Sequence, residues 1–250
     1  MMQGILKTMG ENFTPAEIER YARHLVLPEI GGAGQQKLKT ARVLVIGAGG
    51  LGSPVLAYLA AAGVGHLGLI DHDDVSLSNL QRQILYCDQD QGHPKTAAAE
   101  RFITARNPYV KLTTHCQKLT ADIIESLLAP YDIIVDASDN FATRYLLADY
   151  AAILQKPLVS GAIQRFDGMV TVLMPYQSNN PHYRDLFPVP PPDDQQENCT
   201  QIGVVGALAG IIGSLQALEV IKLITKSGTP LIGRLLLYHG LSSTFQTIHY

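Results

Sequence analysis

A continuous apolar run that ends in a glycine-rich loop is the feature that most constrains the fold of this chain. Residues 42–47 read Arg-Val-Leu-Val-Ile-Gly, the composition of a strand that is buried on both faces. Glycines interrupt the pattern over residues 47–52, residues 53–62 are rich in Ala and Leu, and residues 67–71 are again apolar. This strand–helix–strand order predicts a βαβ unit and therefore a parallel sheet.

The same alternation of elements continues through the first two thirds of the chain. Helices are predicted at 95–106, 121–128 and 140–154, and strands at 110–114, 132–136 and 157–161. After Phe166 the pattern changes, because Asp167-Gly168 predicts a hairpin turn. Strands at 169–174, 232–239 and 243–249 and a helix at 203–225 follow. The predicted fold class is α/β, a Rossmann-like, mostly parallel sheet that is extended by antiparallel strands in the C-terminal half.

The predicted organisation is one continuous domain over residues 1–250. Residues 1–165 form its Rossmann-like half, and residues 166–250 form the antiparallel extension. Within the extension, residues 176–200 are polar and rich in proline, which predicts a long mobile loop. At the other end, Thr14-Pro-Ala-Glu17 is typical of a helix start, and one helix is expected from there to a point before Pro28.

The bulk composition excludes several classes of protein. A formal net charge of -3 argues against general nucleic-acid binding, and 46% hydrophobic residues indicate a globular chain. The most apolar stretch, residues 204–218, is shorter than a membrane span, and no signal peptide is visible at the N-terminus. The three cysteines are far apart, which suits a reducing compartment, and Cys87 and Cys116 are interpreted as structural. The expectation is a cytoplasmic protein that binds neither nucleic acid nor membrane.

The glycine-rich loop and a carboxylate predict a nucleotide site. Gly47, Gly49, Gly50 and Gly52 let the backbone approach a phosphate closely, and the helix that follows offers free N–H groups. Asp71 ends the second predicted strand, where a carboxylate can accept both ribose hydroxyls. These residues do not decide which nucleotide is bound.

A second group of residues favours phosphate chemistry. Arg82 and Lys95 can neutralise phosphate charge, Asn79 can hydrogen-bond a phosphate, and Asp139 can hold Mg²⁺. A substrate carboxylate is already ionised at neutral pH, so its adenylation by ATP needs positioning and charge neutralisation rather than a general base. An NAD-dependent oxidoreductase is the alternative, but it leaves Arg82, Lys95 and Asp139 unexplained. A catalytically silent nucleotide-binding scaffold is the third possibility.

The sequence resembles the MoeB/ThiF/HesA family, the bacterial relatives of ubiquitin-activating enzymes. The matching strings are Arg-Tyr-Ala-Arg at 20–23, the glycine loop at 47–52, Ala-Gly-Val-Gly at 62–65, residues 71–83 with Ser-Asn-Leu-Gln-Arg-Gln, Pro-Lys at 94–95, Asp-Ala-Ser-Asp-Asn at 136–140 and Gly-Val-Val-Gly at 203–206. The resemblance implies ATP-dependent adenylation of the C-terminal glycine of a ubiquitin-like sulfur-carrier protein, such as MoaD or ThiS, that ends in Gly-Gly.

The resemblance also implies residue roles. Asp71 would hold the ATP ribose, Asn79, Arg82 and Lys95 would contact the phosphates, and Asp139 would bind Mg²⁺. Arg23 would be an arginine finger supplied across a homodimer, and the small residues Gly206, Gly210, Gly213 and Ser214 are compatible with close helix packing at such an interface. The pathway, whether thiamine or molybdenum cofactor biosynthesis, stays open. A peptide or a modified tRNA base is a closer rival as the source of the carboxylate.

The sequence departs from the family at its zinc site. Many members carry two C-x-x-C pairs that bind a structural zinc, but here His182-Tyr-Arg-Asp185 stands where the first pair would fall. The second pair would lie near or beyond Tyr250, so no structural zinc is expected. Cys199, in Glu-Asn-Cys-Thr at 197–200, aligns with a cysteine that relatives use in persulfide or thioester-like chemistry. An ordinary loop cysteine is the alternative for Cys199.

Overall fold

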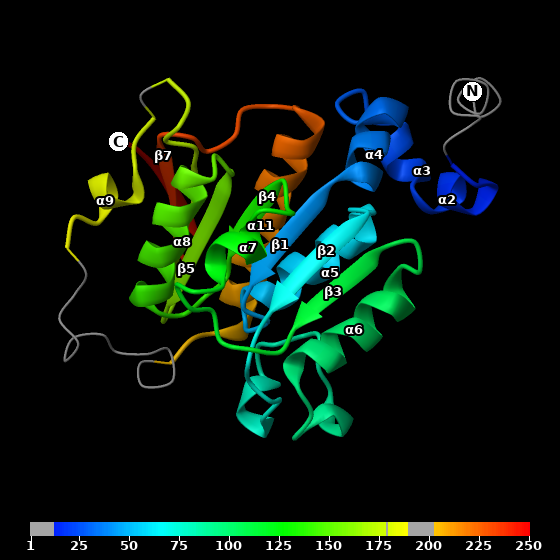
Figure 1. Ribbon diagram of the computed structural model, residues 1–250, viewed down its shortest axis with the longest axis horizontal. Coiled ribbons are helices and arrows are strands. Elements are labelled where there is room, and N and C mark those ends of the chain that lie inside the picture. The colour runs from blue at the N-terminus through cyan, green and yellow to red at the C-terminus, as the bar shows by residue number, and fades with distance from the viewer. Residues whose placement is uncertain (1–12, 179, 190–202) are drawn as a thin grey trace.

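A single eight-stranded sheet organises the chain (Figure 1). The computed structural model describes residues 13–178, 180–189 and 203–250. The strands lie in the order β3-β2-β1-β4-β5-β6-β7-β8, with β3 to β5 parallel and the remainder antiparallel. The predicted fold class is therefore confirmed. The strands are β1 (Arg42–Ile46), β2 (His66–Ile70), β3 (Lys111–His115), β4 (Ile133–Asp136), β5 (Leu158–Gln164), β6 (Asp167–Leu173), β7 (Arg234–His239) and β8 (Thr244–His249).

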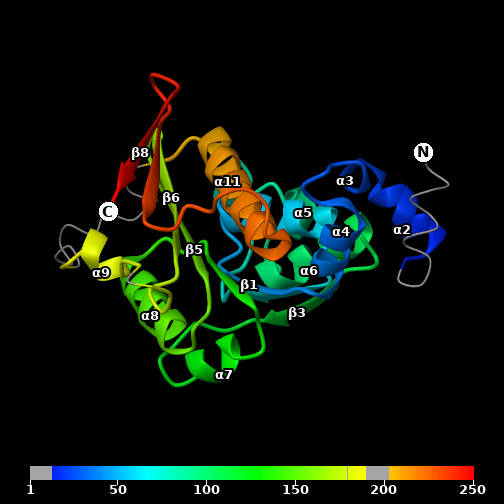
Figure 2. The ribbon, with the colours of Figure 1, turned by 90° about the horizontal axis from the view of Figure 1, so that it is seen from above.

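Helices cover both faces of the parallel half of the sheet. Figure 2 shows α4, α5, α6 and α11 on one side and α7 and α8 on the other. Successive side chains of β1 point into the two cores in turn, Val43 and Val45 into the first and Leu44 and Ile46 into the second. The helices are α2 (Pro15–Arg20), α3 (Ala22–Leu25), α4 (Gly31–Thr40), α5 (Gly52–Ala62), α6 (Lys95–Arg106), α7 (Ile124–Leu128), α8 (Phe141–Ile153), α9 (Tyr183–Leu186) and α11 (Gly206–Thr225).

Helix α11 is longer than the apolar stretch read from the sequence. It has 20 residues, and by length and composition alone it could cross a membrane, so the argument from shortness was wrong. Its apolar character has another cause, because α11 packs on α5, β5 and β6. Gly213 lies so close to Pro54 that an added Cβ would be 2.4 Å from Pro54 Cγ. Gly206 likewise abuts the Gln81 carbonyl, so these two glycines serve packing within the chain, whereas Gly210 has open space beside it.

The N-terminal helix is divided at Tyr21. The predicted capping box is present, since Thr14 Oγ1 accepts from the Glu17 N–H at 3.2 Å and Glu17 Oε2 accepts from the Thr14 N–H at 2.8 Å. The expectation of one continuous helix was wrong, because Tyr21 adopts φ -97° and ψ 11° between α2 and α3. The buried Tyr21 hydroxyl accepts a hydrogen bond from Asn107 Nδ2 at 2.8 Å. That long-range contact accompanies the break, and the local sequence does not reveal it.

The hairpin turn after β5 falls earlier than predicted. Gln164 pairs with Asp167, so Arg165 and Phe166 form the turn, with Arg165 at φ 55°. Gly168 lies inside β6 opposite Ile163. A Cβ there would be 2.4 Å from the side chain of Ile212 on α11, so this glycine is required for close helix packing and not for a turn.

Two further expectations need correction. The segment 176–200 is not a loop throughout, because it contains α9, and the Tyr145 hydroxyl on α8 donates to the Phe187 carbonyl at 2.7 Å. Residues 190–200, Cys199 among them, lie outside the described part of the chain. Cys87 and Cys116 are exposed free thiols and not core residues. The Cys87 thiol donates to Asp90 Oδ2 at 3.3 Å.

Candidate functional site

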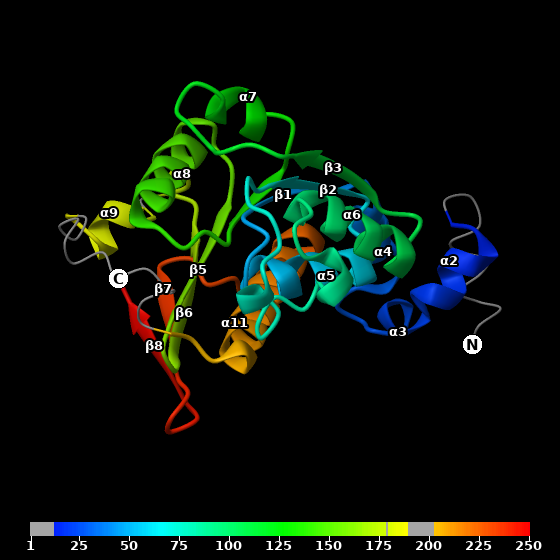
Figure 3. The ribbon, with the colours of Figure 1, turned by 90° about the horizontal axis from the view of Figure 1, so that it is seen from below.

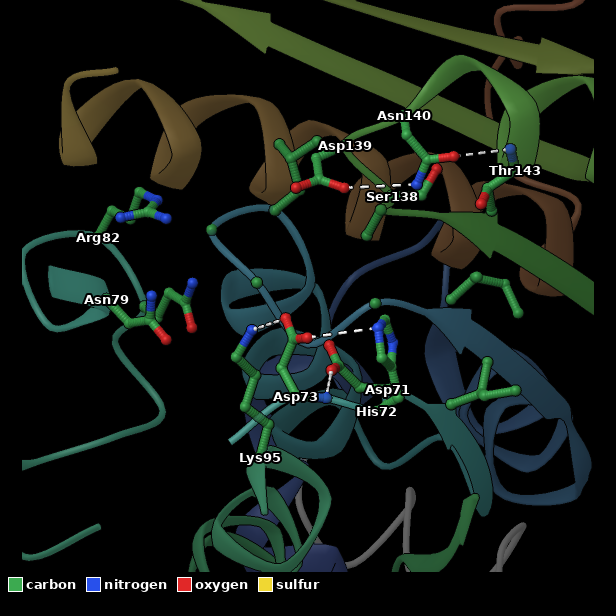
Figure 4. A pocket seen from close by; sticks show the side chains of 18 of the residues that line it. Asp71, His72, Asp73, Asn79, Arg82, Lys95, Ser138, Asp139, Asn140 and Thr143 are labelled. Carbon is green, nitrogen blue, oxygen red and sulfur yellow. Dashed lines mark hydrogen bonds and ion pairs between the residues drawn. The ribbon is translucent and has the colours of Figure 1, made fainter. Parts of the chain in front are cut away.

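A cavity of about 530 Å³ lies at the carboxyl ends of the parallel strands. It opens between β1 and β4, where the strand order reverses. After β1 the chain adds β2 and β3 on one side of the sheet, and β4 then lies on the other side of β1. Such a switch point is where open α/β sheets bind ligands. Figure 4 shows three groups of side chains around this space, with Asn79 and Arg82 on one side, Asp71, Asp73 and Lys95 on another, and Asp139 and Asn140 on a third.

The glycine-rich loop forms one wall of the cavity. Gly47, Gly49 and Gly50 line it directly, whereas Gly52 lies behind them as the first residue of α5. A Cβ on Gly52 would be 1.9 Å from the Gly47 carbonyl oxygen, so only glycine allows this tight turn. Gly47 itself has φ 93°. The free N–H groups of the α5 N-terminus therefore face a place where a phosphate could lie.

Asp71 ties the glycine loop to the end of β2. Its Oδ2 accepts from the Ala48 N–H at 2.7 Å, and its Oδ1 accepts from the Asp73 N–H at 2.9 Å. The carbonyl of Ala48 is held as well, because it accepts a hydrogen bond from the Tyr86 hydroxyl at 2.8 Å. Burial, together with the nearby charge of Asp71, raises the pKa of Tyr86 far above its ordinary value, so the phenol stays a donor.

Lys95 is a buried cation of the site. It begins α6, is 5% exposed, and places Nζ at 2.7 Å from Asp73 Oδ2. Partial burial by itself would raise the pKa of Asp73, but the hydrogen bond and charge of Lys95 hold that pKa below its usual range. Asp73 is therefore a carboxylate at neutral pH.

Asn79 and Arg82 come from the segment that follows β2. Asn79 Oδ1 accepts from the Ser76 N–H at 3.2 Å, and Arg82 NH1 donates to the Ser78 carbonyl at 3.0 Å. Within the described residues no carboxylate forms an ion pair with Arg82. Its charge is thus available to an anion in the cavity.

Gln83 is a site residue to which the sequence reasoning assigned no role. Its side chain is 3% exposed, lines the cavity beside Gly49, and has a buried Oε1 without a hydrogen-bond partner. An unpaired buried amide oxygen is costly unless a ligand or water satisfies it. The signal was present in the sequence, since Gln83 ends the Ser-Asn-Leu-Gln-Arg-Gln string, but only its burial distinguishes it from a surface residue.

Asp139 offers an uncommitted carboxylate on the opposite side. It follows β4, is exposed, and within the described residues its side chain has one hydrogen-bond contact, Asn140 Nδ2 at 3.5 Å from Oδ1. Asn140 caps α8 by accepting from the Thr143 N–H at 2.9 Å. No cation among the described residues forms an ion pair with Asp139. Carboxylate oxygens are the ligands that Mg²⁺ prefers, so Asp139 could hold such an ion.

Arg23 does not reach this cavity. It is an exposed residue of α3, which lies toward the opposite end of β1 from the cavity (Figures 1 and 3). The cavity lining of the described chain does not include it. The fold therefore brings together Asp71, Asn79, Arg82, Lys95 and Asp139 around the glycine loop, and leaves Arg23 outside.

These features define a Rossmann-type α/β protein whose switch-point cavity places two basic side chains across from a carboxylate. The model of the ThiF family matches residues 21–250, and the chain belongs to that family.

Curated relatives agree over nearly the whole chain. A sulfur carrier protein adenylyltransferase of Thermus thermophilus is 47% identical over 94% of this chain and 88% of its own length. An adenylyltransferase and sulfurtransferase MOCS3 of Culex quinquefasciatus is 49% identical, but the match spans 52% of that protein. A probable adenylyltransferase/sulfurtransferase MoeZ of Mycobacterium tuberculosis is 46% identical over 60% of its length. This chain thus spans 52% of the length of the MOCS3 relative and 60% of the length of the MoeZ relative, both of which are named as sulfurtransferases.

Solved structures support the fold. The crystal structure of PaaA superposes with a TM-score of 0.81 at 23% identity, covering 96% of this chain and 75% of PaaA. That of Escherichia coli MccB with ATP gives 0.80 at 21% identity, covering 96% of this chain and 72% of MccB.

Proposed function

We propose that this protein uses ATP to adenylate the C-terminal glycine carboxylate of a small ubiquitin-like sulfur-carrier protein that ends in Gly-Gly. The observation that carries the proposal is the arrangement of Arg82 and Lys95 beside the glycine loop, with the free carboxylate of Asp139 facing them across one cavity. The 47% identity to a sulfur carrier protein adenylyltransferase supports the substrate class.

The reaction suits a site without a general base. A carboxylate oxygen of the carrier forms a bond to the α-phosphorus of ATP while the bond from that phosphorus to its bridging oxygen breaks. Pyrophosphate leaves with the electron pair, and a mixed anhydride remains. Negative charge on the phosphates is the main obstacle, and Arg82 and Lys95 would lower it, with Asn79 donating from its amide and Asp71 accepting the ribose hydroxyls.

Mg²⁺ is the proposed metal, and Asp139 would hold it. The ion would neutralise phosphate oxygens, which adds to the effect of the two basic side chains.

We propose that the protein holds no structural zinc. At the position of the first zinc pair, Asp185 Oδ2 accepts from the His182 N–H at 2.7 Å, so this carboxylate serves as a helix cap.

A homodimer is proposed because Arg23 lies outside the cavity of its own chain. Subunit mixing tests whether it acts in a second copy. Arg23→Ala and Asp139→Ala homodimers should both be inactive, whereas mixing them should restore about a quarter of the normal rate, since half of randomly formed dimers contain one intact site. No recovery after verified exchange of subunits would contradict action across a dimer.

Cys199 is proposed to act after adenylation. Its thiolate sulfur would form a bond to the acyl carbon while the bond to AMP breaks. Cys199→Ala should then keep ATP–pyrophosphate exchange and lose any thioester.

We also propose that residues 1–250 act as one domain, in the cytoplasm, and that the protein binds neither nucleic acid nor membrane.

ATP–pyrophosphate exchange with Mg²⁺ tests the central proposal. It should depend on one carrier protein ending in Gly-Gly and should vanish in Arg82→Ala and Asp139→Ala, with thermal unfolding showing that both variants fold. Exchange that persists in both variants would refute the site. ATP binding without exchange on any carrier would point instead to another carboxylate, such as that of a peptide, or to a silent scaffold.

A further inference from the structure

We infer that the buried carboxylate of Asp136 is a positioning residue that acts through Ser138 to hold the loop carrying Asp139. The inference rests on the proposed function, because it concerns how the carboxylate assigned to Mg²⁺ is placed. Asp136 does not line the cavity and is fully buried, so it cannot touch a ligand itself.

Asp136 receives hydrogen bonds from two directions. Its Oδ1 accepts from the Ser138 N–H at 3.0 Å and from the Ser138 hydroxyl at 2.6 Å. Its Oδ2 accepts from the Ser160 hydroxyl on β5 at 2.9 Å. The carboxylate thus joins the loop after β4 to the neighbouring strand.

Arg144 holds Ser138 from the other side. It is 8% exposed, and its NH2 donates to the Ser138 carbonyl at 3.1 Å. The main chain of Asp136 is fixed as well, since Gln216 Nε2 on α11 donates to its carbonyl at 2.7 Å. The amide N–H, hydroxyl and carbonyl of Ser138 are therefore all engaged by buried groups.

This arrangement contrasts with the residue that follows. Ser138 is held at three points, whereas in the described part of the chain the Asp139 carboxylate has one long contact, to Asn140. A carboxylate on a rigid backbone can bind a cation without first being ordered. A small displacement of a metal ligand lowers the affinity for the metal. Burying a carboxylate is itself unfavourable, so a neutral side chain would suffice if Asp136 served stability alone. Its charge gives stronger hydrogen bonds to Ser138, which favours the positioning role.

The matched pair Asp136→Asn and Ser160→Ala tests the inference. The first removes the charge that holds Ser138, while the second removes one hydrogen bond to the same carboxylate and leaves the Ser138 contacts in place. Equilibrium binding of Mn²⁺ in the presence of a non-hydrolysable ATP analogue, followed by electron paramagnetic resonance, reports metal affinity without turnover. Thermal unfolding of each variant is measured alongside.

Asp136→Asn should raise the Kd for Mn²⁺ about tenfold, as expected for the loss of a supporting contact to a metal ligand. Ser160→Ala should leave that Kd within about twofold while lowering thermal stability, because it affects the carboxylate but not the loop. An unchanged Kd in Asp136→Asn, or equal shifts in both variants, would overturn the inference. Should Asp136→Asn not fold, Ser138→Ala replaces it and should raise the Kd in the same direction.

Asp139→Asn distinguishes failure of the positioning role of Asp136 from failure of the proposed metal site. If it weakens Mn²⁺ binding but Asp136→Asn does not, the positioning role fails and the proposed site stands. If Asp139→Asn leaves Mn²⁺ binding unchanged, the metal site of the proposed function fails, and the positioning role fails with it.

Discussion

The ammonium group of Lys95 lies 2.7 Å from the carboxylate of Asp73, so this buried cation has a partner within the chain. The two side chains differ in exposure, with 6% of the Lys95 side chain and 52% of the Asp73 side chain accessible to solvent. Lys95 is thus fixed in the wall, whereas Asp73 has room to turn toward water. We expect an incoming triphosphate to compete with Asp73 for the lysine.

Asp73→Asn is expected to tighten ATP binding severalfold, because it removes a negative charge beside the phosphate site. It should also lower the free energy of unfolding by about 1 kcal/mol, because a buried lysine loses its charged acceptor. Isothermal titration calorimetry and urea unfolding measure the two effects. Weaker ATP binding would show instead that Asp73 is needed to orient Lys95.

Lys95→Ala should weaken ATP binding by about 10- to 100-fold, which corresponds to about 1.5–3 kcal/mol for a hydrogen bond to a charged group. Calorimetric titration with ATP and with adenosine separates the cause. Adenosine has no phosphate, so its affinity should not change. An equal loss for both ligands would contradict a phosphate contact.

Tyr86→Phe removes the donor to the Ala48 carbonyl and leaves that buried oxygen without a partner. We expect a loss of about 1 kcal/mol in the free energy of unfolding and a higher KM for ATP, because the glycine loop is less firmly held. Tyr131→Phe is the control, since no hydrogen bond from the Tyr131 hydroxyl is found within the described residues. A KM for ATP that is unchanged in Tyr86→Phe would show that Asp71 alone orders the loop.

Gly213→Ala and Gly210→Ala should have opposite effects on stability. At Gly213 a Cβ would be 2.4 Å from Pro54 and 2.6 Å from the Leu51 carbonyl, so α11 would have to move away from α5. At Gly210 no described residue outside the local helix backbone lies within 4 Å of an added Cβ, and alanine should stabilise the helix by up to about 1 kcal/mol. Thermal unfolding checks both. A stability loss in Gly210→Ala that grows with protein concentration would place Gly210 at a contact between copies.

Glu17→Gln should lower stability at neutral pH and lose its effect in acid. The carboxylate of Glu17 lies 2.7 Å from Lys39 Nζ. Burial would raise the pKa of Glu17, but Lys39 and the hydrogen bonds from Thr14 lower it below the ordinary value of 4.5. A depressed pKa stabilises the fold above the unfolded-state value and ceases to do so as pH falls through the folded-state value. The difference, about 0.5–1 kcal/mol at pH 7, should therefore shrink as pH falls below the ordinary value of 4.5 and vanish once pH is below the lowered pKa of Glu17. Urea unfolding at several pH values measures it.

Much of the parallel half of the fold could be predicted from local patterns. The strand before the glycine loop and the helix at 95–106 were predicted within a residue or two, because periodicity and turn glycines are local properties. The hairpin after β5 was misplaced because Gly168 was interpreted as a turn residue. Glycine is needed at this position because the side chain of Ile212, from a helix distant in sequence, packs against it. The break at Tyr21 escaped prediction for the same reason, since its partner Asn107 is 86 residues away.

The sequence by itself determined many of the chemical groups around the cavity, since the glycine loop, Asp71, Asn79, Arg82 and Lys95 could be read from their motifs, although Gln83 was not among them. Only the tertiary structure decided how those groups are held and which of them are free. The pairing of Lys95 with Asp73, the unpaired oxygen of Gln83 and the clamp of Asp136 and Arg144 on Ser138 depend on burial and on contacts between separate elements. Motif spacing fixes the order of residues along the chain, but the strength of a charge or hydrogen bond depends on the surroundings that the folded chain creates.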